Sequence, residues 1–92
     1  MAVKDTHLRE KIRAIYTRLD GLRNTPRDGA QLERYFRELQ AMAGQLPDPQ
    51  LNSKLSATAD RRVEAYRRDP SNANFRAWVY NLKRDLEEGG HV

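Results

Sequence analysis

Residues 72–88 read NANFRAWVYNLKRDLEE, and this stretch decides the fold that the sequence predicts. Its large apolar residues recur at positions i, i+3, i+4, i+7 and i+11: Phe75, Trp78, Val79, Leu82 and Leu86. This spacing places all five on one face of an α-helix. Because the segment also contains the only tryptophan of the chain, this face should bury more apolar area than any other segment. We therefore predict a helix from Asn72 to about Glu88 that the rest of the chain covers.

A first helix is predicted upstream, from a cap at Asp5 or Thr6 to about Arg23. Its apolar residues alternate in steps of four and three: Leu8, Ile12, Ile15, Leu19 and Leu22. Such a narrow seam is typical of a helix that packs along a near-antiparallel neighbour.

A second helix is predicted after a turn at residues 24–29, with Asp28 and Gln31 in a capping box. The helix should run to about Ala43, followed by Gly44 as a left-handed C-terminal cap. Its apolar face consists of Leu32, Tyr35, Phe36, Leu39, Met42 and Ala43.

A third helix is predicted from Pro49 to about Arg68, with Asp48 as its N-cap. Its inner face is the least apolar of the four and consists of Leu51, Leu55, Ala59, Val63 and Tyr66. The fourth helix, over residues 72–88, should end at Gly89-Gly90 and leave residues 91–92 as a frayed tail.

These segments predict an all-α fold, a four-helix up-down bundle made of two similar helical hairpins. The hairpins span about residues 5–44 and about 49–89 of one domain, residues 1–92. The likeness of residues 30–40 to residues 73–83 fits either a duplication or shared amphipathic periodicity. Because the third helix is weakly apolar, the hairpins could instead open and pair with a second chain. The short, stiff connection at residues 47–49 favours the closed monomer over this homodimer.

The composition restricts the chemistry that the chain can perform. There is no cysteine, so disulfides and thiolate sites are excluded. No apolar run approaches the length of a membrane span, and we expect a cytoplasmic protein with no membrane partner. The two histidines, His7 and His91, have no second ligand at helical spacing, and no glycine-rich phosphate loop is present. We expect no enzymatic activity, no metal and no cofactor.

The exposed face of the last helix suggests a binding function. Arg76, Tyr80 and Arg84 lie there among alanines, and an exposed tyrosine beside arginines has the composition of a binding hot spot. The first hypothesis is a non-enzymatic protein-interaction module, as an adaptor, accessory subunit or inhibitor. Its partner would be another protein.

Basic residues on the third helix suggest an alternative. Lys54, Arg61 and Arg68 recur every seven residues, and Arg62 and Arg67 flank them. Such a surface could contact nucleic-acid phosphates or an acidic protein surface. Basic side chains near a helix C-terminus are also explained by the helix dipole alone, and the net charge of +4 is modest.

Small residues on the first helix suggest a third hypothesis. Ala14, Thr17 and Gly21 lie opposite the leucine seam, and small side chains let a second copy approach closely. Alternatively, Gly21 marks an early end of the helix.

Overall fold

The helix predicted over residues 72–88 is present and lies at the centre of the packing. The computed structural model describes residues 2–92, with side chains from Thr6 onward. In it, α5 (Asn72–Glu88) contacts every other helical element. The hydroxyl of Ser71 caps its first turn by accepting the amide N–H of Asn74 at 3.2 Å. The bounds and the apolar face predicted from the sequence are confirmed, with Val79 at the edge of the core.

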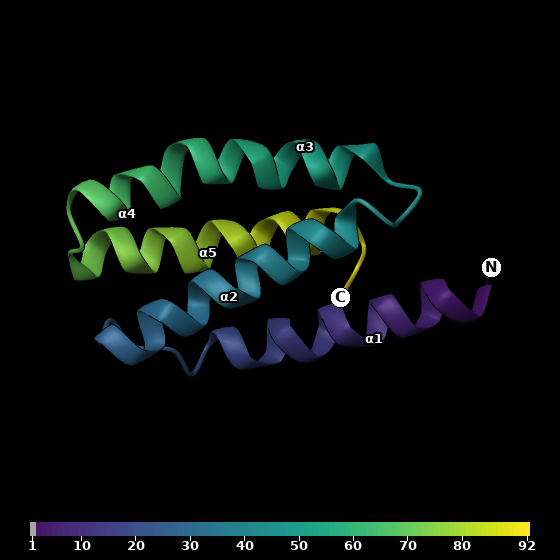
Figure 1. Cartoon of the computed structure of the whole chain (residues 1–92), viewed down its shortest axis with the longest axis horizontal. Helices are drawn as coiled ribbons and strands as arrows, with labels where there is room; N and C mark the ends of the chain where they lie inside the picture. Colours follow the sequence, from purple (N-terminus) through teal and green to yellow (C-terminus); the bar gives the residue numbers. More distant parts are fainter. Residues whose placement is uncertain (1) are drawn as a thin grey trace.

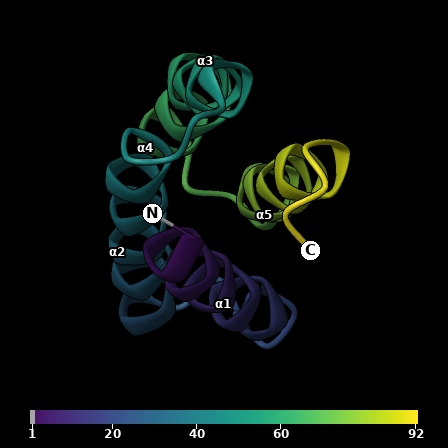
Figure 2. The ribbon, with the colours of Figure 1, turned by 90° about the vertical axis from the view of Figure 1, so that its right-hand side faces the viewer.

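The described residues form four helical rods and no strand, so the all-α class is confirmed. The rods are α1 (Ala2–Leu19), α2 (Pro26–Ala43), a composite third rod, and α5. The third rod joins α3 (Pro49–Thr58), a π-helical segment η1 (Ala59–Val63) and α4 (Glu64–Arg68). Successive rods run in opposite directions along the long axis (Figure 1). Seen from the end in Figure 2, α2 and α5 each lie between α1 and the third rod, and both contact these two neighbours.

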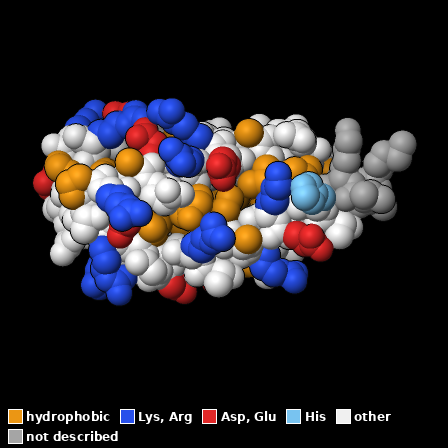
Figure 3. Space-filling view, turned by 60° about the horizontal axis from the view of Figure 1, so that its bottom comes forward, with side chains coloured by type: hydrophobic (Ala, Val, Ile, Leu, Met, Phe, Trp, Pro, Cys, Tyr) orange, Lys and Arg blue, Asp and Glu red, His pale blue; other side chains and the backbone are white. Residues whose placement is uncertain are grey.

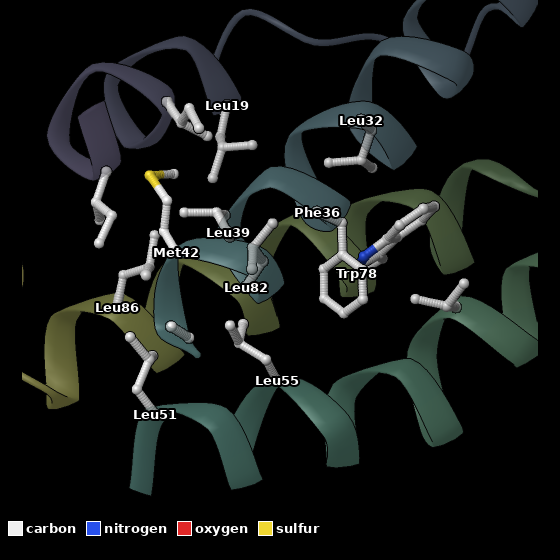
Figure 4. Packing of buried hydrophobic residues seen from close by; sticks show 14 of the residues in the cluster. Leu19, Leu32, Phe36, Leu39, Met42, Leu51, Leu55, Trp78, Leu82 and Leu86 are labelled. Carbon is white, nitrogen blue, oxygen red and sulfur yellow. The ribbon is translucent and has the colours of Figure 1, made fainter. Parts of the chain in front are cut away.

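The core forms where the apolar faces of all four rods meet (Figure 4). At one end of it, the rings of Phe36 and Trp78 meet edge to face, with centroids 5.9 Å apart, and Tyr66 packs 5.6 Å from Trp78. The indole nitrogen of Trp78 is buried without a hydrogen-bond partner and lies on the side of the ring toward Phe36.

The third rod is not the uninterrupted α-helix that the sequence predicts. Leu51, Leu55, Ala59 and Val63 follow one another in steps of four. Each such step rotates a side chain by about 40° around an α-helix, because a turn takes 3.6 residues. The π-helical segment accommodates one extra residue. The wider turn brings Val63 back to the core, and Thr58 is buried beside it.

The first two helices begin differently from the prediction. Because α1 begins at Ala2, Thr6 lies inside the helix, and the side chain of Asp5 lies outside the described residues. The cap of α2 is Thr25 rather than Asp28: its hydroxyl accepts the amide N–H of Asp28 at 3.1 Å. The Asp28 carboxylate turns back and accepts the amide N–H of Arg23 at 3.0 Å. The Thr25-Pro26 pair decides the start, since proline is well suited to the first helical position.

The first helix ends earlier than predicted, whereas the second ends at Ala43 as predicted but with a different cap. α1 ends at Leu19 rather than at Arg23. A turn follows, in which the amide of Gly21 donates to the carbonyl of Arg18 and the amide of Leu22 to that of Leu19. Gly44 ends α2 in the right-handed conformation, with φ −67°, so the predicted left-handed cap is wrong.

The left-handed cap is found at the end of α5 instead. Gly90 has φ +72°, the amide of His91 donates to the Leu86 carbonyl, and that of Gly90 to Glu87, each at 3.1 Å. This pair of bonds defines a Schellman motif. The turn directs His91 inward, where it is 5 % exposed and its Nε2 lies 2.8 Å from the Asp48 carboxylate. Residue 91 is therefore not part of a frayed tail; it ties the end of α5 to the N-cap of α3.

Replacing Leu82 with alanine tests the central role of α5. We expect Leu82→Ala to lower the free energy of unfolding by about 2–5 kcal/mol, because Leu82 is fully buried and alanine leaves a cavity. Tyr80→Ala, on the exposed side of the same helix, should change it by no more than about 0.5 kcal/mol. Urea unfolding followed by circular dichroism measures both, and equal losses would contradict the packing.

The link between Asp48 and His91 should depend on pH. The His91 hydrogen bond and the Leu51 amide lower the pKa of Asp48. A lowered pKa stabilises the fold above the unfolded-state pKa, and this contribution is lost as the pH falls through the folded-state pKa. We expect Asp48→Asn, which keeps the cap, to unfold at a lower temperature than wild type near neutral pH, with the gap closing below about pH 4. Asp60→Asn is the control, and a gap independent of pH would refute this role.

Candidate protein-binding groove

A groove of about 550 Å³ lies between the end of α1, the turn that follows it, and the first turns of α5. It is called the α1–α5 groove below. Its lining consists of Leu19, Asp20, Leu22, Arg23, Asn24, Thr25, Asn72, Phe75, Arg76, Val79, Tyr80 and Lys83. The groove therefore contains two of the three residues predicted for partner binding, Arg76 and Tyr80, and leaves out Arg84.

Helical periodicity explains which part of α5 forms the groove wall. Counted from Arg76, three further lining residues follow at positions +3, +4 and +7: Val79, Tyr80 and Lys83. This spacing places all four on one strip along the helix. Tyr80 is 67 % exposed, the most exposed of the large apolar side chains described. Partly exposed apolar surface of Val79 and Leu22 continues from Tyr80 into the groove, and the buried Phe75 lies beneath it.

Lys83 joins α5 to α1 at the edge of the groove. Its Nζ lies 2.5 Å from Asp20 Oδ1 and 5.2 Å from the centroid of the Tyr16 ring. The Tyr16 hydroxyl in turn donates to the carboxylate of Glu87. The hydrogen bond to Asp20 raises the pKa of Lys83, and the bond to Glu87 raises the pKa of Tyr16. Periodicity offers no signal for this arrangement, because Asp20 and Lys83 are 63 positions apart.

The other two cations of the groove, Arg76 and Arg23, differ in whether their guanidinium groups make hydrogen bonds within the fold. Among residues 2–92, no hydrogen bond or ion pair is found for Arg76, and its side chain is exposed. Arg23 donates through one guanidinium nitrogen to the carbonyls of Asp20 and Leu22, at 3.3 and 3.1 Å. Together with Lys83, these residues give the lining three cations against one carboxylate, so the groove carries a net positive charge.

Arg84, the third residue predicted for partner binding, belongs to a different contact. Its Nε lies 2.8 Å from Glu88, and the same carboxylate lies 3.2 Å from the ammonium of Lys54. These hydrogen bonds, that of Arg84 first, lower the pKa of Glu88. Arg84 and Lys54, predicted for two separate sites, thus share one carboxylate at the α3–α5 seam.

The basic surface predicted on the third helix is divided. Arg67 lies 2.7 Å from Glu33 on α2 and 3.3 Å from Glu64, and its hydrogen bond lowers the pKa of Glu33. Within the part of the chain that the structure describes, Arg61, Arg62 and Arg68 are exposed and make no ion pair. On the face drawn in Figure 3, basic side chains are likewise interspersed with acidic ones, with hydrophobic side chains exposed between them. Two of the five predicted cations are therefore already paired.

The strip predicted for self-association is shorter than expected. Ala14 and Thr17 are exposed on α1, and the Thr17 hydroxyl donates to the Arg13 carbonyl at 3.0 Å. Gly21 lies in the turn beyond α1, which agrees with the alternative that it marks the helix end.

The described residues include no group of three or more histidine, aspartate or glutamate side chains that could hold a metal. No described helix combines the length and the hydrophobicity needed to cross a membrane. No protein-family model, curated protein or solved structure matches the chain.

Asp85 is a buried carboxylate that the apolar pattern does not reveal. It is 7 % exposed in the α3–α5 interface and accepts the Thr58 hydroxyl at 2.5 Å, while Asn81 donates to the same hydroxyl at 3.4 Å. Burial raises the pKa of Asp85, and the bond from Thr58 partly offsets this. Raised pKa values often mark catalytic carboxyls, yet these contacts give Asp85 a structural role in joining the two helices.

Replacing Asp85 with asparagine should be harmless or stabilising near neutral pH. The variant keeps an oxygen acceptor for Thr58 and removes a buried charge. A raised pKa adds stability below the unfolded-state pKa, and this stability is lost as the pH rises through the folded-state pKa. The advantage of Asp85→Asn should therefore disappear below about pH 4, as measured by thermal unfolding. Thr58→Val is the contrasting variant, with a loss of about 1–3 kcal/mol. A large loss in Asp85→Asn at neutral pH would contradict this account.

Proposed function

We propose that this protein is a non-enzymatic protein-interaction module, an adaptor, accessory subunit or inhibitor, that binds a protein partner in the α1–α5 groove. The observation that carries the proposal is the exposed ring of Tyr80 beside the guanidinium of Arg76, which has no partner among the described residues, at the edge of a groove with mixed polar and apolar lining. Tyrosine and arginine contribute disproportionately to binding energy when a partner covers them.

The chemistry of the lining supports a protein partner. Partly exposed apolar surface of Val79 and Leu22 loses water when a side chain enters, which favours association. The surrounding cations and the amides of Asn24 and Asn72 supply the polar rim that protein interfaces need. A volume of about 550 Å³ holds a few partner side chains rather than a whole helix.

The scaffold proposed for this groove is a closed monomer, a four-helix up-down bundle of two similar hairpins. Polar links at both ends support it. Asn24 accepts the Tyr66 hydroxyl at 2.6 Å and donates to the Pro70 carbonyl at 3.0 Å, which joins two connections at one end. The His91–Asp48 contact joins the chain at the other end.

Nucleic-acid binding is the second candidate, and one observation favours it. Arg61, Arg62 and Arg68 are exposed, and no ion pair within the described residues neutralises them. It ranks second because Lys54 and Arg67, which should belong to the same surface, are held by carboxylates of other helices.

Affinity purification from the native cells, with and without nuclease, separates the two candidates. The bait carries wild type, the groove variant Arg76→Gln/Tyr80→Ala, the third-helix variant Arg61→Gln/Arg68→Gln, or the control Arg34→Gln, which replaces an exposed arginine outside the groove. We expect one stoichiometric protein to survive nuclease and to bind every bait except the groove variant. Its affinity for the purified groove variant should fall at least about tenfold, since hot-spot truncations remove about 2 kcal/mol or more.

The opposite pattern would replace this proposal with the second candidate. Binding that disappears with nuclease, that needs Arg61 and Arg68, and that weakens log-linearly with salt concentration indicates phosphate contacts. A partner that binds wild type and the groove variant equally would refute the groove as the site.

A further inference from the structure

We infer that the α1–α5 groove selects a carboxylate on the partner, and that Asp20 occupies its place on Lys83 in the free protein. This inference rests on the proposed function and adds the partner's chemistry: a protein segment with an aspartate or glutamate next to a large apolar side chain. In the complex, the partner's carboxylate replaces Asp20, and the apolar side chain covers Val79 and Leu22.

The two members of the Asp20–Lys83 pair differ in how firmly they are held. The side chain of Asp20 is 70 % exposed and that of Lys83 only 22 %. Asp20 lies beyond the last residue of α1, and among residues 2–92 the only recorded partner of its carboxylate is Lys83. Exposed ion pairs contribute little net stability, so turning Asp20 into water costs little.

Lys83 keeps its position when Asp20 leaves. Its ammonium lies over the Tyr16 ring, and the bond from the Tyr16 hydroxyl to Glu87 fixes that ring between α1 and α5. A cation held in this way is preorganised for an incoming anion, which reduces the entropy lost on binding.

The charge of the groove complements an acidic partner. With Asp20 displaced, Lys83, Arg76 and Arg23 line it without a carboxylate among them. Arg76 already has an open guanidinium, whose planar fork suits a carboxylate. The apolar surface next to these cations requires that the acid carry, or lie beside, a large apolar group. A highly acidic but wholly polar segment would leave this surface uncovered.

The experiment uses the full-length chain, labelled with ¹⁵N, and a minimal probe. The probe is 3-phenylpropionate, which joins an aromatic ring to a carboxylate, and its matched control is the uncharged 3-phenylpropanamide. Wild type is compared with Asp20→Asn and with Asp60→Asn, which removes the same charge from an exposed position outside the groove. Thermal unfolding establishes that these three proteins, and the variant Lys83→Gln, are folded.

We expect the acid to shift the amide resonances of Val79, Tyr80 and Lys83 and to bind more tightly than the amide. Asp20→Asn should bind the acid about two- to fivefold more tightly than wild type, the range that corresponds to a weak exposed ion pair. Asp60→Asn should bind as wild type does. Lys83→Gln should bind the acid more weakly than wild type and show a smaller preference for the acid over the amide.

Three results would overturn the inference. The first is that the acid leaves the groove resonances unchanged in both wild type and Asp20→Asn. The second is that wild type binds the acid and the amide with equal affinity. The third is that Asp20→Asn binds the acid no more tightly than wild type does. None of them affects the proposed function, which fails only if the cellular partner is nucleic acid or binds independently of Arg76 and Tyr80.

Discussion

The burial of one apolar face of α5 is the constraint on which the rest of the structure depends. Trp78, Leu82 and Leu86 need cover on several sides, and no single neighbouring helix is wide enough to provide it. For this reason α1, α2 and the third rod all contact α5. The opposite face of α5 then has no helix left to cover it. Tyr80 is exposed because of this division, and the groove forms where α1 ends while α5 continues.

Polar contacts between residues distant in sequence fix the positions of the segments that connect the helices, which the apolar core alone does not do. The Asn24 amide joins the α1–α2 connection to the α4–α5 connection, and His91 joins the chain end to the α2–α3 connection. A chain of 92 residues buries only about 60–65 % of its unfolded surface, so such links matter more here than in a larger domain. The link at Asn24 also fixes one wall of the α1–α5 groove, because Asn24 lines it.

The apolar periodicity predicted where the helices lie, but it predicted their ends less well. The spacing of apolar residues predicted the core residues of α2 and α5. Burial depends on the face of the helix that a residue occupies, and the position of a residue in the sequence determines that face. The π-helical segment had a signal in the successive steps of four from Leu51 to Val63, which an α-helix cannot keep on one face. The pairs Asp20–Lys83, Asp48–His91 and Thr58–Asp85 had none, since each joins residues that only the packing of the helices brings together. Of the groove lining, only Arg76 and Tyr80 on α5 were therefore predicted as binding residues, and the part supplied by α1 and the turn after it was not.

The distribution of ion pairs decides which predicted cations remain available for a partner. Arg84 and Lys54 share the single carboxylate of Glu88, and Arg67 pairs with Glu33, so these three cations make ion pairs within the fold. On the strip of α5 that faces the groove, the cations are Arg76, which has no partner among the described residues, and Lys83, whose partner is an exposed side chain. A cation that is already paired within the fold exchanges one carboxylate for another when a ligand binds, which gains less than pairing a free cation does. On α5, the cation without a partner among the described residues, Arg76, lies one helical turn before the exposed ring of Tyr80.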